Sequence, residues 1–310
     1  MERKSEGAGK GHLFGGDWTN QKLDILAKYL SAYTVALKDK PSSATPFRKA
    51  FIDAFAGTGY RDLSGSSSEV DTGQSVFPDL VESEPQALLD GSARIALQTD
   101  PPFDRYIFIE RSPSRCAHLE ALKAEFPERA DRIDIQQADA NACIQELCGP
   151  TKSWKSRRAV LFLDPYGMQV DWKTIEAVAS TKAIDLWLLF PLGIGLTRLL
   201  PRTGKVPQPW RRKLDQFLGT QDWYDKFYAV ETVQTLFGEE EAQVAKEKLD
   251  TIGQYFVDRL KTIFVGVAER PGVLRNSSGR PLYLLCFAVG NERGKTVALR
   301  IANDLLKEIR

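Results

Sequence analysis

Four apolar runs, each ending in a carboxylate or a glycine-containing turn, follow one another along the first half of this chain of 310 residues. They occupy residues 51–59, 106–110, 136–140 and 161–167. Doubly wound α/β proteins bind adenosyl cofactors at the carboxyl ends of parallel strands, where such polar positions meet. The order of the four runs therefore predicts a sheet of this kind. It favours S-adenosylmethionine and methyl transfer over a nicotinamide cofactor.

The composition narrows the class of protein and its partners. The chain is 43% hydrophobic and 27% charged, as is usual for a globular protein. Its net charge is +1, so any nucleic-acid surface must be local. No apolar run approaches the length of a membrane span, and residues 1–10 lack the apolar core of a signal peptide. Four cysteines without Cys-x-x-Cys spacing and two histidines predict no metal site and a reducing, cytoplasmic location.

Strands that alternate with helices predict a parallel sheet covered on both faces. We expect a Rossmann-like class I methyltransferase fold, with a seven-stranded, mostly parallel sheet whose last strand is antiparallel. The expected strands are 50–55, 105–110, 133–137, 158–163, 186–190, 262–267 and 283–289. The last two are joined by a turn-rich link without a helix, which predicts an antiparallel hairpin at the sheet edge. The expected helices are 17–38, 91–99, 112–126, 141–147, 171–180, 239–261 and 294–309.

Two insertions interrupt the expected domain, which spans residues 14–310 after a disordered N-terminus at 1–13. Residues 62–90 carry seven carboxylates and no Lys or Arg, which predicts a solvated acidic loop. Residues 191–261 form a predicted helical insertion whose later half is one long helix. The chain shows no internal repeat.

The first run contains the candidate cofactor turn. Gly57 and Gly59 flank Thr58 and let the backbone pass close to a ligand, where a side chain would clash. No ordered helix is expected directly after this turn, which disfavours a diphosphate at a helix start. Asp53 is placed to accept a hydrogen bond from the methionine ammonium. The alternative is a tight turn with a capping Asp.

Two further carboxylates follow the next strands. Glu110 is placed to accept both ribose hydroxyls, and Asp139 to accept the adenine amino group. A charged residue at a strand end and a turn Asp are the structural alternatives. The 62–90 insertion accounts for the long spacing between Gly59 and Glu110. The predicted cofactor contacts also include Phe55, Arg111 and Ala140.

Asp164, Pro165 and Tyr166 are the candidate catalytic residues. Amine methyltransferases that act on nucleobases carry Asp/Asn-Pro-Pro-Tyr/Phe at this position, where the acid and the first proline carbonyl accept hydrogen bonds from the exocyclic amine. The aromatic ring stacks on the flipped base. The single proline here, in Asp-Pro-Tyr-Gly, is closer to the Asp-Pro-Phe-Gly of tRNA guanine-N2 methyltransferases. A structural turn is the alternative.

Residues 197–226 combine seven Lys or Arg with three Asp and four aromatic residues that include Trp210 and Trp223. This stretch predicts a nucleic-acid face in which cations contact phosphates and a Trp stacks a base. Surface arginines with buried aromatics are the alternative. The residues predicted to bind nucleic acid are Arg198, Arg202, Trp210, Arg211, Arg212 and Lys213.

The segments 14–19, 51–61, 100–110, 163–172 and 184–193 together resemble the three-Cys-motif partner protein family. The resemblance covers roughly residues 14–310. It implies a methyltransferase-like Rossmann fold, a bacterial or phage setting, and a partner with a three-cysteine motif like that of radical S-adenosylmethionine enzymes.

Two functions from different classes follow. The first is an S-adenosylmethionine-dependent methyltransferase acting on an exocyclic amine of a nucleic-acid base. The second is a non-catalytic, methyltransferase-like partner that docks the three-cysteine protein. A methyltransferase with a small-molecule substrate remains a third reading, because the net charge is near zero.

Overall fold

The computed structural model describes residues 17–56, 91–165, 167–234 and 240–309. The predicted disordered N-terminus at 1–13 and the predicted acidic loop at 62–90 lie outside these residues. Within them, no helix is both long enough and apolar enough to cross a membrane.

One central sheet organises the described chain, and its strand order is β10-β12-β7-β6-β3-β4-β5. The pairs from β7 to β5 are parallel, and β12 runs antiparallel to β7. This order, with one reversed strand next to the edge, confirms the predicted class I methyltransferase fold. The strands are β3 (Arg48–Asp53), β4 (Arg105–Glu110), β5 (Ile133–Gln137), β6 (Arg157–Leu163), β7 (Ile184–Phe190), β10 (Gly266–Val267) and β12 (Pro281–Val289).

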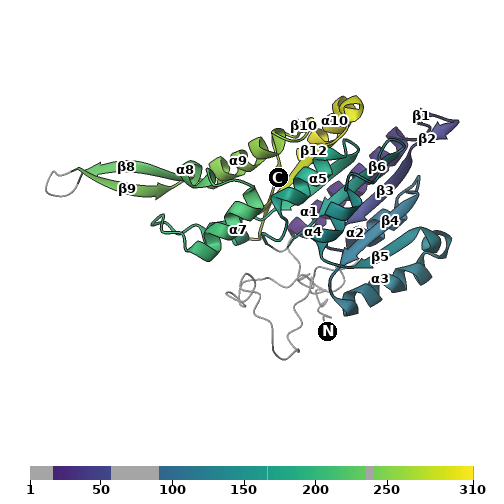
Figure 1. Cartoon of the computed structure of the whole chain (residues 1–310), viewed down its shortest axis with the longest axis horizontal. Helices are drawn as coiled ribbons and strands as arrows, with labels where there is room; N and C mark the ends of the chain where they lie inside the picture. Colours follow the sequence, from purple (N-terminus) through teal and green to yellow (C-terminus); the bar gives the residue numbers. More distant parts are fainter. Residues whose placement is uncertain (1–16, 57–90, 166, 235–239, 310) are drawn as a thin grey trace, which may run out of the picture.

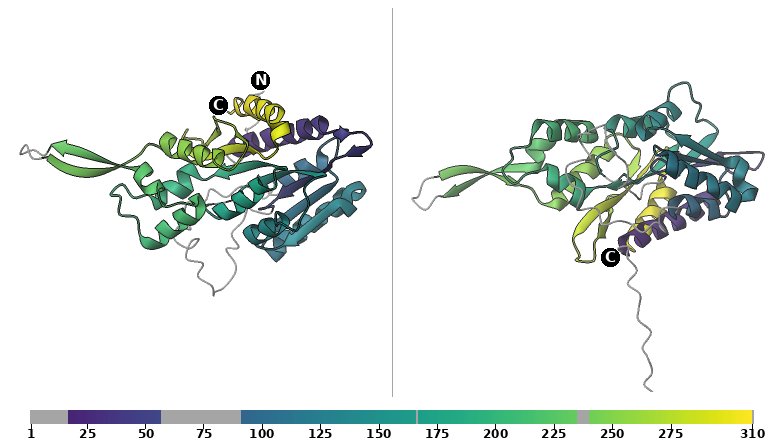
Figure 2. Two further views of the ribbon diagram at one scale, coloured as in Figure 1. Left: turned by 45° about the horizontal axis from the view of Figure 1, so that its top comes forward. Right: turned by 90° about the horizontal axis from the view of Figure 1, so that it is seen from below.

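Side chains along each central strand alternate between two cores, one on each face of the sheet. In β3, Phe51 joins one core and Ile52 the other, because successive side chains of a strand point to opposite faces. The Phe51 face is covered by α1 (Asp17–Ala36), α2 (Gly91–Gln98), α3 (Pro113–Glu125) and α10 (Lys295–Leu306). The Ile52 face is covered by α4 (Ala140–Leu147), α5 (Trp172–Ser180), α7 (Gln208–Leu218) and α9 (Leu249–Lys261). Figure 2 shows these layers from two further sides.

The prediction of one helix over 239–261 is wrong. Residues Glu240–Lys246 form β9, which pairs antiparallel with β8 (Tyr228–Gln234), and α9 begins only at Leu249. The two strands form a ribbon that projects from the body of the molecule beyond α8 (Trp223–Phe227) (Figure 1). Residues 240–246 contain no glycine or proline that would end a helical pattern. Their pairing with β8 could therefore not be predicted from the local sequence.

The sheet edge also differs from the prediction. The expected strand at 262–267 shortens to Gly266–Val267, because Thr262 still caps the end of α9. The link that was expected to be only turns contains β11 (Gly272–Arg275), which pairs with β12. Both short strands bond to the same edge of β12, so β11 adds an eighth strand beside the seven predicted ones.

Candidate functional site

Three carboxylates gather at the carboxyl ends of neighbouring parallel strands. Asp53 ends β3, Glu110 ends β4, and Asp164 directly follows β6. In register, Asp53 lies opposite Phe108 of β4 and Phe162 of β6. By the alternation of side chains, all three carboxylates lie on the face that α1, α2 and α3 cover. Their contacts agree, because Lys22 of α1, Ser92 of α2 and Arg115 of α3 reach them.

Asp53 is a buried carboxylate, with 1% of its surface exposed. Its Oδ2 accepts a hydrogen bond from the Ser92 hydroxyl at 2.6 Å, and its Oδ1 accepts one from the Phe55 backbone N–H at 3.2 Å. Burial raises its pKa to about 7, and the nearby Asp164 raises it further, whereas these hydrogen bonds and Lys22 oppose the rise. A bound cation beside Asp53 would favour the ionised carboxylate, because Lys22 offsets its negative charge only in part.

Glu110 is buried as well, and its two side-chain contacts with described residues involve the same carboxylate oxygen. Its Oε1 accepts a hydrogen bond from the Ser112 backbone N–H at 2.6 Å and lies 3.2 Å from Arg115 Nε. Within the described part of the chain, Oε2 takes part in no hydrogen bond. These contacts hold the carboxylate in place and leave one oxygen able to accept hydroxyl groups of a ligand.

Asp164 forms an ion pair with Lys22, which reaches it from α1. The distance from Lys22 Nζ to Asp164 Oδ2 is 2.6 Å. Lys22 is only 3% exposed, and its ammonium also lies 4.8 Å from the ring centre of Trp18. Trp18 in turn stacks on Tyr283 of β12. Among the described residues, Asp164 Oδ1 takes part in no hydrogen bond, whereas Oδ2 is paired with the lysine.

The loop that follows Asp164 is held by Asn141 of α4. The Asn141 side-chain amide donates to the Gln169 carbonyl at 2.8 Å, and its oxygen accepts from the Asp171 backbone N–H at 2.9 Å and from the Thr174 hydroxyl at 2.8 Å. Pro165 is buried at the start of this loop, and Tyr166 lies outside the described residues. The network therefore fixes the end of this loop and its junction with α5.

The other predicted cofactor residues differ in how far they are exposed to solvent. Asp139 is exposed and caps α4, because its Oδ1 accepts a hydrogen bond from the Ala142 N–H at 3.0 Å. Arg111 is exposed and Phe55 is half-buried, whereas Ala140 is buried. The glycine turn with Gly57, Thr58 and Gly59 lies outside the described residues.

Part of the basic stretch at 197–226 has the alternative arrangement, in which arginines lie at the surface and aromatic residues are buried. Trp223 is fully buried and donates a hydrogen bond to Asp215, so the prediction that it can stack a base is wrong. Arg211 lies over the ring of Tyr224, 5.0 Å from the ring centre. Trp210 and Lys213 are half-buried, while Arg202 and Arg212 are exposed. Arg198, also half-buried, lies in the short helix α6 (Thr197–Leu199).

Three residues that shape the site were not predicted from the sequence, namely Lys22, Ser92 and Asn141. Lys22 had a readable signal. It sits four residues after Trp18 and three before Ile25, on the same helical stripe that buries both. A lysine on a buried stripe needs a partner, because an unpaired buried charge is costly. Ser92 and Asn141 carry no such signal, since polar residues near a helix start are common.

The cysteines are thiols without a disulfide, and burial raises the pKa of Cys116, Cys143, Cys148 and Cys286. In the described ranges no three His, Cys, Asp or Glu side chains are arranged to hold a metal ion.

Comparisons with known proteins find distant structural likenesses only. No family model and no curated protein matches the chain. A Legionella pneumophila protein aligns with a TM-score of 0.41 and 12% identity, over 96% of this chain and 94% of that one. Spermidine synthase from Thermotoga maritima gives 0.37 and 11%, over 89% and 60%. A structure titled a putative S-adenosylmethionine-dependent methyltransferase, from Listeria monocytogenes, gives 0.36 and 11%, over 87% and 100%. Membership of the three-Cys-motif partner family therefore stays a prediction.

Proposed function

We propose that this chain is an S-adenosylmethionine-dependent methyltransferase that acts on an exocyclic amine of a nucleic-acid base. The observation that carries the proposal is the set of three carboxylates at the ends of β4, β3 and β6 in a class I methyltransferase sheet. Each carboxylate contacts a side chain from a different helix on the same face of the sheet. Glu110 and Asp164 each have one oxygen without a hydrogen bond among the described residues.

The chain's residues fit an adenosyl cofactor in charge and donor chemistry. Glu110 Oε2 is an acceptor for ribose hydroxyls, and the buried Asp53 is an acceptor for the methionine ammonium. Bound S-adenosylmethionine supplies a methyl group that its sulfonium already activates. The proposed cofactor site also includes the other residues predicted from the sequence, namely Phe55, Gly57, Thr58, Gly59, Arg111, Asp139 and Ala140.

The protein's remaining task is to position the amine and to exclude water from it. Asp164 Oδ1 accepts one amine hydrogen in this proposal and the Pro165 carbonyl accepts the other, which directs the nitrogen lone pair toward the methyl group. Lys22 holds Asp164 through its other oxygen, and it stabilises the ionised, accepting form. Tyr166 is proposed to stack the base.

A nucleic-acid base is the proposed substrate for two reasons. The Asp-Pro-Tyr-Gly segment resembles the reaction-side motif of base methyltransferases. The basic stretch follows β7, next to β6 and Asp164, and presents Arg202 and Arg212 to solvent. Arg198, Trp210, Arg211 and Lys213 remain proposed contacts of the same face.

Two measurements test the proposal. Isothermal calorimetry with S-adenosylhomocysteine should show binding, and Glu110→Gln should weaken it by about 1.5–3 kcal/mol, the worth of hydrogen bonds to a charged group. Transfer of radiolabelled methyl groups to DNA or RNA should be lost in Asp164→Ala, which has no side-chain acceptor, while that variant still binds S-adenosylhomocysteine. Glu120→Gln, an exposed carboxylate on α3, is the matched control for both assays.

The projecting ribbon of β8 and β9 favours the second function. A two-stranded ribbon is marginally stable without further packing, which suits a segment that a partner covers. If wild-type protein binds S-adenosylhomocysteine but transfers no methyl group to DNA, RNA or protein, the docking role for a three-cysteine protein replaces the enzymatic one.

A further inference from the structure

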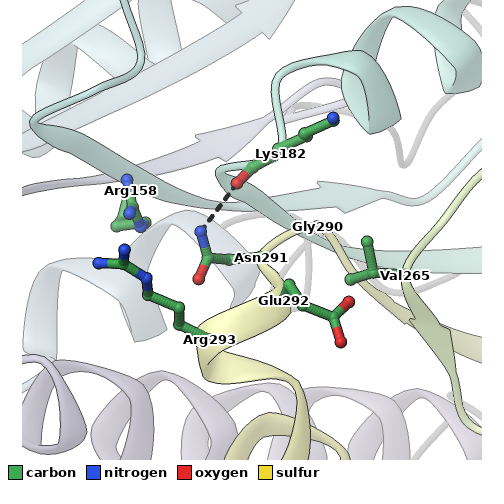
Figure 3. A pocket seen from close by; sticks show the side chains of 7 residues that line it. All are labelled: Arg158, Lys182, Val265, Gly290, Asn291, Glu292 and Arg293. Atoms are coloured by element: carbon green, nitrogen blue, oxygen red, sulfur yellow. Dashed lines mark hydrogen bonds between the residues drawn. The ribbon is translucent and has the colours of Figure 1, made fainter.

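Two adjoining hollows lie at the amino edge of the sheet, opposite the candidate site. The first has a volume of about 460 Å³ and is lined by Arg158, Lys182, Asn291 and Arg293, among others (Figure 3). The second, of about 500 Å³, also includes Arg158 and Lys182, and adds Lys152, Trp154 and Lys155. Both hollows have Arg158 and Lys182 in their linings, so they adjoin, and together they are called the groove below. Arg158 is the second residue of β6 and Asp164 follows its end, so the groove and the candidate site lie about 20 Å apart.

The groove carries an excess of positive charge among the residues that the structure describes. Five cations line it, namely Lys152, Lys155, Arg158, Lys182 and Arg293. Its one carboxylate, Glu292, lies 3.9 Å from Lys295. Across the described residues, no carboxylate lies within ion-pair distance of the five. Asp185, a buried carboxylate near Arg158, is held instead by the Tyr29 hydroxyl at 2.9 Å and the Gly290 N–H at 3.3 Å.

Part of this charge is held in place rather than free in solvent. The Arg158 guanidinium packs over the Phe47 ring at 3.9 Å and donates to the Trp154 carbonyl at 3.2 Å. Burial lowers the pKa of Arg158, Tyr33 and Asp185 oppose that effect, and Arg293 adds to it. Figure 3 shows Arg158 and Arg293 on the same side of the first hollow. Neither guanidinium forms an ion pair with a carboxylate among the described residues, and an anion bound between the two would supply charge-assisted hydrogen bonds to both.

Lys182 is held by its backbone. Its φ of 52° lies in the left-handed region, where glycine is favoured, and its carbonyl accepts a hydrogen bond from the Asn291 side chain at 3.0 Å. This bond joins the rim formed by residues 180–182 to the rim formed by residues 290–293. The lysine therefore stands at the junction of the two hollows, at a position where its backbone conformation is unfavourable.

We propose that this groove binds the phosphate backbone of a single-stranded nucleic acid. Cations spread over two connected hollows suit successive phosphates of a strand better than one isolated phosphate, and Trp154 adds an aromatic wall. The groove is separate from the candidate cofactor site and from the basic stretch at 197–226. The proposal does not require the chain to be a methyltransferase.

The test is the fluorescence anisotropy of a labelled single-stranded oligonucleotide of mixed sequence, titrated with the full chain at several salt concentrations. The variant Lys155→Gln/Lys182→Gly/Arg293→Gln removes three cations of the groove. Its affinity should fall at least tenfold, and the slope of log K against log salt should decrease by about 2, because each phosphate contact contributes about 0.7. Lys182→Gly suits the left-handed backbone, so an unchanged melting temperature is expected.

The matched control, Lys123→Gln/Lys261→Gln/Lys307→Gln, removes the same charge from α3 and from the ends of α9 and α10. It should change the affinity less than twofold, and both triple variants should bind S-adenosylhomocysteine as the wild type does. No binding by the wild type, full binding by the groove variant, or an equal loss in the control would each overturn the proposal. A competition experiment with sodium tripolyphosphate gives a further test. If it displaces the labelled oligonucleotide as well as unlabelled strand does at equal phosphate concentration, the site recognises small polyphosphates and the proposal is overturned.

Discussion

Lys22 Nζ lies 2.6 Å from Asp164 Oδ2, although the two residues are 142 positions apart in the chain. The pair ties the N-terminal helix α1 to the loop after β6, at the edge of the sheet where Asp53 and Glu110 also lie. Lys22 is almost completely buried, whereas the Asp164 side chain keeps 20% of its surface. The pair is therefore buried on the lysine side and partly open to solvent on the carboxylate side.

Breaking this pair should destabilise the protein. Lys22→Met leaves Asp164 without its cation, and we expect the free energy of unfolding to fall by about 1–3 kcal/mol, less than for a fully buried pair because Asp164 is partly hydrated. Urea unfolding of Lys22→Met, Asp164→Asn and the double variant should show a coupling above about 1 kcal/mol. Lys28→Met breaks only exposed pairs with Asp24 and Glu308, and it should cost less. Equal costs for Lys22→Met and Lys28→Met would contradict the role given to Lys22.

Binding of S-adenosylhomocysteine should strengthen with pH through the titration of Asp53. Burial raises the pKa of Asp53 to about 7, so the carboxyl is mostly neutral at pH 5.5 and mostly ionised at pH 7.5. Over this range an amino acid ammonium stays largely protonated. We expect the association constant from calorimetry to rise roughly twentyfold from pH 5.5 to 7.5, following the ionised fraction of such a group. Asp53→Asn should remove that rise, and a rise that persists in the variant would assign it to another group.

Ionisation of Asp185 should lower the stability of the protein as pH rises. Burial raises its pKa to about 6, above the value of about 3.9 expected in the unfolded chain. The folded state therefore holds the proton more tightly, and the contribution of Asp185 to stability is complete below about pH 4 and lost as pH passes 6. Asp185→Asn keeps an acceptor for the Tyr29 hydroxyl but carries no charge. Relative to wild type, this variant should gain about 1–3 kcal/mol in unfolding free energy between pH 4 and pH 7.

The control for that experiment is Asp304→Asn, in an exposed carboxyl that pairs with Lys307. Its pKa is lowered by this lysine, so its contribution has the opposite pH dependence. A gain of the same sign and size in Asp304→Asn would show that the effect does not come from burial of Asp185. Asp53 titrates in an overlapping range, so the fall in stability with pH should be reduced by Asp185→Asn rather than abolished.

Adjacent arginines on α7 should have separable roles. Arg211 packs on Tyr224 and near Trp223, so Arg211→Met should lower stability by about 1 kcal/mol, the worth of a cation–π contact. Arg212 is exposed, and Arg212→Met should leave stability within about 0.5 kcal/mol but weaken oligonucleotide binding. Thermal unfolding and anisotropy measure the two effects. Unchanged binding in Arg212→Met would remove α7 from the proposed nucleic-acid face.

Most of the sheet was predictable because its signals are local. The apolar runs that end at Asp53, Glu110 and Asp164 became the ends of adjacent parallel strands, as their order in the chain implies. Each run contains a period of two or a continuous apolar stretch bounded by turn residues, and neither depends on distant parts of the chain. The same locality explains the one wrong helix, since residues 240–246 look helical on their own and become a strand only against β8.

By itself, the sequence determined which residues carry carboxylates at strand ends, and thereby the class of fold and the edge where a cofactor would bind. Only the tertiary structure decided which side chains meet there. Lys22, Ser92 and Asn141 reach the site from three different helices, and the groove at Arg158 and Lys182 forms from segments more than a hundred residues apart. The physical reason is that strand and helix periodicity is a property of neighbouring residues, whereas charge pairing and concave surfaces depend on how whole elements pack.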